Sequence, residues 1–154
     1  MENFEIKNQK EFMNGLLVGD KFDNFLLKEA VIKTANTFTV DGMVNREYYG
    51  NDEDIIAMES PYDYSEWSKV KSTIHALIKG KHTPVSMRVT LYLKPDCMPD
   101  VLGSEPNLVD YLILNLHFIN GGMNLTTAIA YREFTFDKEP EKLWDRFIAK
   151  LLEA

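Results

Sequence analysis

The sequence contains a single cysteine, Cys97, among 154 residues. One cysteine excludes an intrachain disulfide and makes a reducing compartment the expected location. Hydrophobic runs are short, because Asn115 and His117 interrupt the longest one, whereas a membrane-spanning helix needs about 20 apolar residues. The N-terminus lacks the basic start and the apolar stretch of a signal peptide. These absences predict a cytoplasmic protein with no membrane partner.

Motifs for metal, phosphate and nucleophilic chemistry are also missing. His75, His82 and His117 fall on different predicted elements, and neither His-Glu-x-x-His nor Cys-x-x-Cys occurs. The glycines are scattered, so no phosphate-binding loop and no Gly-x-Ser-x-Gly elbow is present. Cys97 has no neighbouring base in the sequence that would activate it as a nucleophile. We therefore expect no cofactor and no metal, and a catalytic role is disfavoured.

What the sequence does contain is the composition of an ordinary globular domain, with 45% hydrophobic and 27% charged residues. A chain of roughly 150 residues buries about two-thirds of the surface that its unfolded form exposes, so its core needs no disulfide or metal. Length and composition predict a single domain over residues 1–154.

Hydrophobic periodicity predicts three helices, over residues of about 9–18, 65–79 and 138–152. In the first, Asn8 and Glu11 have the spacing of a capping box. In the other two, apolar residues recur on one face at helical spacing.

Alternating patterns predict about five to seven strands. The predicted strands are residues 4–6, 24–34, 37–40, 43–49, 86–93, 111–119 and 122–136. Residues 50–63 are predicted to be mostly loop, and residues 94–110 a long loop that has room for one helical turn near 99–102. The predicted strands and helices each have an apolar face to bury. Helices packed largely on one face of a mainly antiparallel sheet bury these faces, so the sequence predicts an α+β fold.

The Asn120-Gly121 pair between the last two strands favours a two-residue hairpin turn. In that register His117 faces Asn124, and the neighbouring positions form a mixed polar face opposite an apolar one. The polar patch consists of Asn115, His117, Asn124 and Thr126. A histidine among amides could act as an acid or base, so a small enzyme using His117 is one alternative. A solvated sheet face is the other interpretation.

Charge is segregated along the chain. Residues 46–66 hold seven acids and one base, a net charge of −6, whereas residues 67–94 hold six bases and no acid, a net charge of +6. Helical spacing places Lys71, His75 and Lys79 on one ridge, and Lys81 and His82 extend it. This ridge predicts a binding site for a small anionic ligand.

Two other interpretations of the ridge stay open. Acids near the start of a helix and lysines near its end complement the helix dipole, and the acidic segment could fold back over the basic one. Nucleic acid is disfavoured as a partner, because most aromatic residues near the lysines lie in the acidic segment.

Four segments carry a resemblance to a known family: residues 16–23 (LLVGDKFD), 36–42 (NTFTVDG), 77–84 (LIKGKHTP) and 134–138 (FTFDK). In these segments the chain resembles a family of clostridial-type Firmicutes proteins that is described only as a domain of unknown function. The resemblance implies a bacterial, cytoplasmic origin and supplies no catalytic residues.

These observations favour a non-catalytic binding or accessory domain with a local basic anion-binding patch. A homo-oligomer or an interaction protein that buries a sheet edge is the third hypothesis, beside the binding domain and the small enzyme.

Overall fold

The computed structural model describes residues 1–153, and residue 154, the end of the predicted domain, lies outside the described residues. The described residues form a seven-stranded antiparallel sheet in the order β1-β7-β6-β5-β2-β3, with β4 beside β2. The strands are β1 (Asn3–Glu5), β2 (Phe25–Lys33), β3 (Thr37–Asp41), β4 (Ser65–Glu66), β5 (Ser86–Leu93), β6 (Val109–Ile119) and β7 (Gly122–Tyr131). The α+β class and the antiparallel sheet are therefore confirmed.

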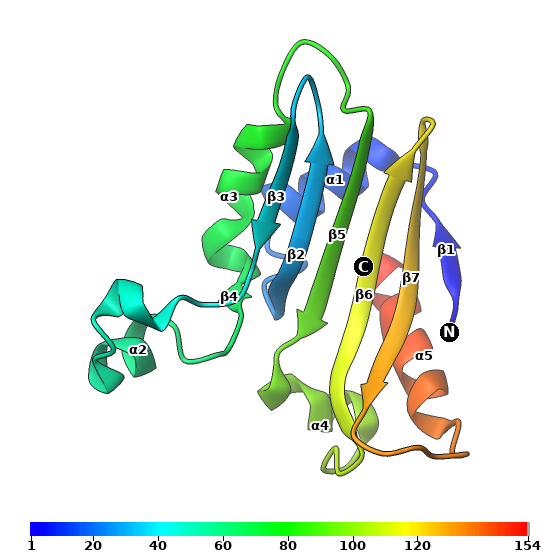
Figure 1. The fold of residues 1–154 in the computed structure, drawn as a ribbon. Coiled ribbons are helices and arrows are strands. Elements are labelled where there is room, and N and C mark those ends of the chain that lie inside the picture. Colours follow the sequence, from blue (N-terminus) through cyan, green and yellow to red (C-terminus); the bar gives the residue numbers. More distant parts are fainter. Residues whose placement is uncertain (154) are drawn as a thin grey trace.

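Five α-helices accompany the sheet in residues 1–153, where the sequence predicted three. They are α1 (Gln9–Leu17), α2 (Glu53–Glu59), α3 (Trp67–Ile78), α4 (Met98–Leu102) and α5 (Glu139–Glu153), with short 3₁₀ turns η1 (Arg46–Tyr49) and η2 (Pro95–Cys97). Helices α1, α3 and α5 all lie on one face of the sheet, and the face toward the viewer in Figure 1 carries no helix among the described residues. None of the described helices is both long and apolar enough to cross a bilayer.

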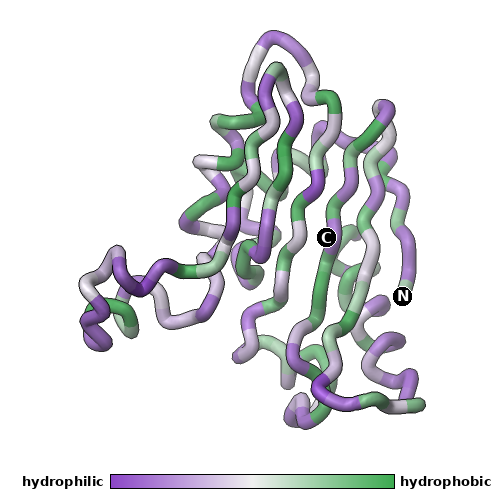
Figure 2. Tube along the Cα trace, in the orientation of Figure 1, coloured by the Kyte–Doolittle hydropathy of each residue, from purple (hydrophilic) through white to green (hydrophobic). Residues whose placement is uncertain are grey.

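The alternation of apolar and polar residues along the strands explains why the helices cover only one face of the sheet. Hydrophobic and hydrophilic residues alternate along β5, β6 and β7 (Figure 2), and every second residue is buried in β5 and, from Leu112 on, in β6. The hairpin register is the predicted one, since His117 pairs with Asn124 and Asn115 with Thr126. Asn120 and Gly121 both have positive φ, as a two-residue turn of this kind requires.

The core lies between the sheet and the helices around two fully buried tryptophans, Trp67 and Trp144. Each indole N–H has a partner, because Trp67 donates to the carbonyl of Leu16 at 2.8 Å and Trp144 to the carbonyl of Ile113 at 2.9 Å. The tryptophans thereby connect α3 to α1 and α5 to β6 without leaving a buried donor unpaired.

Four local predictions were wrong. Residues 65–66 are a strand, because they pair with Leu27 and Leu26 of β2, and helix α3 begins only at Trp67. Residues 43–49 form an isolated bridge and the turn η1 instead of a strand. Part of the 50–63 loop is helix α2, which Asp52 caps. Strand β7 ends at Tyr131, where the following Arg132 N–H bonds to the carbonyl of Leu108.

Candidate functional site

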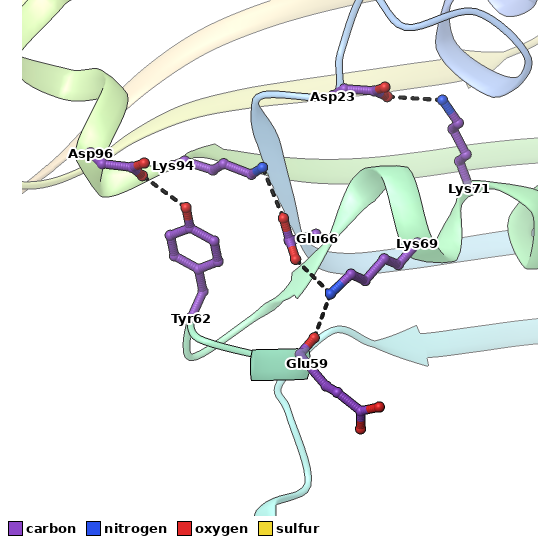
Figure 3. A network of polar contacts seen from close by, with 8 residues as sticks. All are labelled: Asp23, Glu59, Tyr62, Glu66, Lys69, Lys71, Lys94 and Asp96. Atoms are coloured by element: carbon purple, nitrogen blue, oxygen red, sulfur yellow. Dashed lines mark hydrogen bonds and ion pairs between the residues drawn. The ribbon is translucent and has the colours of Figure 1, made fainter. Parts of the chain in front are cut away.

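Lys71, the first residue of the predicted basic ridge, is already engaged within the protein. Its ammonium donates to the carbonyl of Gly19 at 2.7 Å and forms an ion pair with Asp23 at 2.8 Å (Figure 3). Its side chain is only 16% exposed. Lys71 therefore ties α3 to the segment that follows α1, and its charge is neutralised there.

His75 follows one helical turn later and lies half-buried beside α1. Beyond the end of α3 the backbone turns away, and Lys79, Lys81 and His82 are exposed. Within residues 1–153 these three side chains form no ion pair and no hydrogen bond with the protein. The structure thus divides the ridge into a neutralised start, a half-buried histidine and three free groups.

A surface groove runs between α1 and α3 where His75 lies. This α1–α3 groove has a volume of about 560 Å³, and its lining includes Asn8, Lys10, Met13, Leu17, Val18 and His75. Asn8 also caps α1, since its side-chain oxygen accepts the N–H of Glu11 as the predicted cap requires, while its side-chain amide, and not its backbone N–H, donates to the Glu11 carboxylate. The cap fixes where α1 begins and therefore where the groove opens.

A smaller apolar pocket continues from this groove, because Lys10 and Met13 line both. We call it the Met pocket; its volume is about 220 Å³, and its apolar lining is Met13, Ile78, Pro84, Met87, Phe118 and Met123. Methionine side chains are flexible and polarizable, so such a surface adapts to ligands of different shape.

Lys79, Lys81 and His82 are next to the Met pocket in the sequence. They belong to the segment 79–85, which we call the basic loop, and this segment joins Ile78 to Pro84, two residues of the pocket lining. Its end is fixed by a hydrogen bond from Val85 N–H to the carbonyl of Lys33, at the end of β2. An apolar cavity and free positive charge are therefore neighbours on the surface.

The acidic segment pairs with the basic one only in part. Glu66 forms ion pairs with Lys69 and Lys94, both at 2.9 Å, and the carbonyl of Glu59 accepts a hydrogen bond from Lys69 (Figure 3). These contacts lie at the start of α3, whereas the basic loop lies beyond its end. Internal pairing thus accounts for Lys69 and Lys94 and leaves the basic loop unpaired.

Tyr62 lies beside this ion-pair network. Its hydroxyl donates to Asp96 at 3.0 Å, and the ammonium of Lys94 lies 5.5 Å from the centre of its ring. Burial, together with the hydrogen bond to Asp96, raises the pKa of Tyr62 to about 12. The phenol is therefore neutral at physiological pH and joins two elements through its hydrogen bond.

The alternative polar patch is assembled as predicted on the uncovered face of the sheet. Asn115, His117, Asn124 and Thr126 occupy adjacent positions of β6 and β7. The hydroxyl of Thr90 donates to Asn115 at 3.0 Å. His117 is exposed, and no described helix covers this face (Figure 1). An acid–base role needs a water-excluding pocket, which an open face does not provide.

A tyrosine cluster on the same face was missed. Tyr92 and Tyr111 stack with ring centres 4.2 Å apart, and Tyr64 meets both edge-on. Burial raises the pKa of Tyr92 and of Tyr111. The alternation of β5 and β6 could have placed Tyr92 and Tyr111 on this face, but nothing local locates Tyr64. Because the rings pack on each other, they do not offer free stacking surfaces.

Cys97 is not activated as a nucleophile. Burial and the nearby Asp96 raise the pKa of the half-buried Cys97 thiol, which keeps it protonated at neutral pH. Among residues 1–153, no group of three or more His, Cys, Asp or Glu side chains is placed to hold a metal ion.

Residues 15–154 match a protein family described as a family of unknown function (DUF5721). The chain belongs to this family. The expected membership of a family of unknown function is thus confirmed, and the four resembling segments all lie within the matched residues. No curated protein and no solved structure matches the chain. Because the DUF5721 description names no activity, the function has to be inferred from the site.

Proposed function

We propose that this chain is a non-catalytic binding domain that takes an anionic ligand with an apolar part at the Met pocket and the basic loop. The observation that carries the proposal is an apolar cavity of about 220 Å³ with the exposed Lys79, Lys81 and His82 in the loop that joins two of its lining residues, Ile78 and Pro84. Ligand sites are typically apolar cavities with a few polar groups that fix orientation.

The exposed position of the basic loop at a helix end makes a bare anion a poor ligand for this site. The C-terminus of α3 points its free carbonyl groups toward the basic loop, and a helix C-terminus carries partial negative charge. This partial charge opposes only part of the charge of the two lysines, but both lysines are exposed, so water and salt screen their attraction for a small inorganic ion. An apolar portion in the Met pocket must therefore supply a large share of the binding free energy.

Thermal-shift and calorimetric titrations with three probes test the proposal: decanoate below its micelle concentration, decan-1-ol and inorganic phosphate. Decanoate should stabilise the protein, decan-1-ol less so, and phosphate not at all. In Lys79→Ala/Lys81→Ala the affinity for decanoate should fall about fivefold, since each exposed charge contributes about 0.5 kcal/mol.

The matched control is Lys142→Ala/Lys150→Ala, which removes two exposed lysines of α5 far from the basic loop in the sequence. This control should bind decanoate as the unmodified protein does. If decanoate does not stabilise the protein, or if both double variants bind it equally well, the proposed site is wrong.

We propose, in addition, that this chain comes from clostridial-type Firmicutes bacteria and that it functions in the cytoplasm. The four resembling segments support the origin, and the single cysteine, Cys97, supports a reducing compartment. Fractionation of such cells with an antibody against the protein should place it in the cytoplasmic fraction. Recovery from the membrane or the medium would contradict this location.

A further inference from the structure

Residues 42–64 form an excursion between β3 and β4, which we call the arm. It projects away from the sheet at the lower left of Figure 1, far from the loop that joins α3 to β5 at the top. The arm leaves and rejoins the sheet at one point, because Met43 and Tyr64 form a bridge and Ser65 N–H bonds to the carbonyl of Gly42.

The arm has a fixed internal structure. One guanidinium nitrogen of Arg46 lies 2.6 and 2.7 Å from the two carboxylate oxygens of Glu53, so η1 and α2 are connected. The hydroxyls of Tyr49 and Ser60 lie 3.0 Å apart, and Ile56 is only 5% exposed. The arm therefore presents a defined surface.

That surface combines negative charge with exposed apolar side chains. Six acids and one base give residues 42–64 a net charge of −5. Tyr48 is 84% and Met58 is 83% exposed, and Met43 and Ile55 are exposed as well. An anionic surface with an apolar part is the chemistry that the Met pocket and the basic loop fit.

We infer that the ligand of this site is the arm of a second copy of the same chain. Charge complementarity supports this choice, because the acidic arm and the basic loop belong to the same chain. Val85 of the basic loop is 68% exposed and provides an apolar contact beside the lysines. The arm and the basic loop of one chain lie at opposite ends of the sheet (Figure 1), so the contact forms between copies.

This inference rests on the proposed function, because both use the same site, and it identifies the occupant. Sedimentation velocity over a concentration series should show self-association of the full chain. Decanoate should compete with the arm, so adding it should shift the protein toward the monomer. High salt should do the same, since the contact includes exposed charges.

Charge reversal identifies the two surfaces. Asp54→Lys/Glu59→Lys in the arm and Lys79→Glu/Lys81→Glu in the basic loop should each weaken self-association at least tenfold. All four residues are exposed, and far-UV circular dichroism checks that each variant folds. Mixing the two variants should restore association, because the reversed arm of one faces the reversed loop of the other.

The matched control is Glu105→Lys/Glu133→Lys, which changes the net charge equally at two exposed residues outside the arm. It should associate as the unmodified chain does. A chain that stays monomeric at millimolar concentration overturns the inference, as does association that survives both reversals or that mixing fails to restore. A monomer that still binds decanoate leaves the proposed function intact, whereas a monomer that binds no decanoate refutes both.

Discussion

Glu66 connects three elements through one carboxylate. It accepts a hydrogen bond from Lys94, which directly follows β5, and forms an ion pair with Lys69 of α3. Its side chain and that of Lys94 are only 16% and 14% exposed, so solvent screens this pair weakly. Burial disfavours the ionised form, but the hydrogen bonds and charges of the two lysines outweigh burial and lower the pKa of Glu66.

Glu66→Gln should lower the free energy of unfolding at neutral pH by about 2 kcal/mol, because Lys94 is left without its anionic partner. Since the folded-state pKa is lowered, the stabilisation is present above the ordinary pKa of 4.5 and disappears as pH falls through the folded-state value. Urea denaturation at about pH 7 and about pH 3 should therefore show the difference closing on acidification.

The control for Glu66→Gln is Glu47→Gln. Glu47 is an exposed residue of η1, so this substitution should change the free energy of unfolding little at either pH. A difference between Glu66→Gln and the unmodified protein that stays constant down to about pH 3 would contradict the role assigned to the carboxylate.

Gly42 allows the arm to leave the sheet. A Cβ atom at this position would lie 1.7 Å from the carbonyl oxygen of Leu27, and backbone hydrogen bonds hold Gly42 to Lys28 and Ser65. We expect Gly42→Ala to lower the free energy of unfolding by about 3 kcal/mol, because backbone must move to relieve the clash. Chemical denaturation checks this, with Gly80→Ala as the control, since a Cβ at Gly80 meets nothing within 4 Å. Equal effects of the two substitutions would contradict it.

At the scale of elements, the short strand β1 depends on the buried Thr127. Its backbone N–H donates to the carbonyl of Glu2, its hydroxyl accepts the Glu2 N–H at 2.9 Å, and the same hydroxyl donates to Asp145 of α5. Three segments far apart in the sequence therefore meet at one side chain.

Thr127→Val should lower the free energy of unfolding by about 2 kcal/mol, because it leaves the Glu2 N–H and the Asp145 carboxylate without this partner. Local opening should increase most in β1, which hydrogen exchange of residues 3–6 would detect. Thr126→Val on the open face of β7 is the control. Unchanged protection in β1 would show that Thr127 does not hold this strand.

The strands and long helices were predictable because their signals are local. Alternation fixed the faces of β5 and β6, the Asn120-Gly121 pair fixed the hairpin register, and the Asn8–Glu11 spacing fixed the start of α1. Helix α2 was missed although Asp52 and the acids that follow it are an N-terminal signal, because seven residues are too few to show an apolar stripe.

The candidate site was predictable only in part, because its parts meet through tertiary packing. The spacing of Lys71, His75 and Lys79 predicted one ridge, but α3 ends at Ile78 and Lys79 has extended backbone, so only Lys71 and His75 lie on the helix. The partner that neutralises Lys71 is Asp23, which lies 48 residues away, and the Met pocket draws on α1, α3 and three strands. No local sequence pattern can indicate a contact between residues that are so far apart in the chain.

At the scale of the whole molecule, the described core is continuous from α1 and α3 to α5. The prediction of a single domain therefore implies one cooperative unfolding transition. Trp67→Phe leaves Trp144, whose indole bonds to β6, and Trp144→Phe leaves Trp67, whose indole bonds to α1. In each variant, the urea midpoint from tryptophan fluorescence should coincide with the midpoint from far-UV circular dichroism. Separate midpoints would indicate units that unfold independently.

The arm begins and ends at neighbouring residues, since the carbonyl of Gly42 accepts the N–H of Ser65 at 2.8 Å. The entropic cost of closing a loop grows only slowly with its length, and exposed segments of this kind tolerate insertion and deletion well. The fold therefore has a natural splice point here. A short turn could join β3 to β4 in place of the arm, and a segment of different length and chemistry could be grafted at the same two residues while the sheet keeps its register.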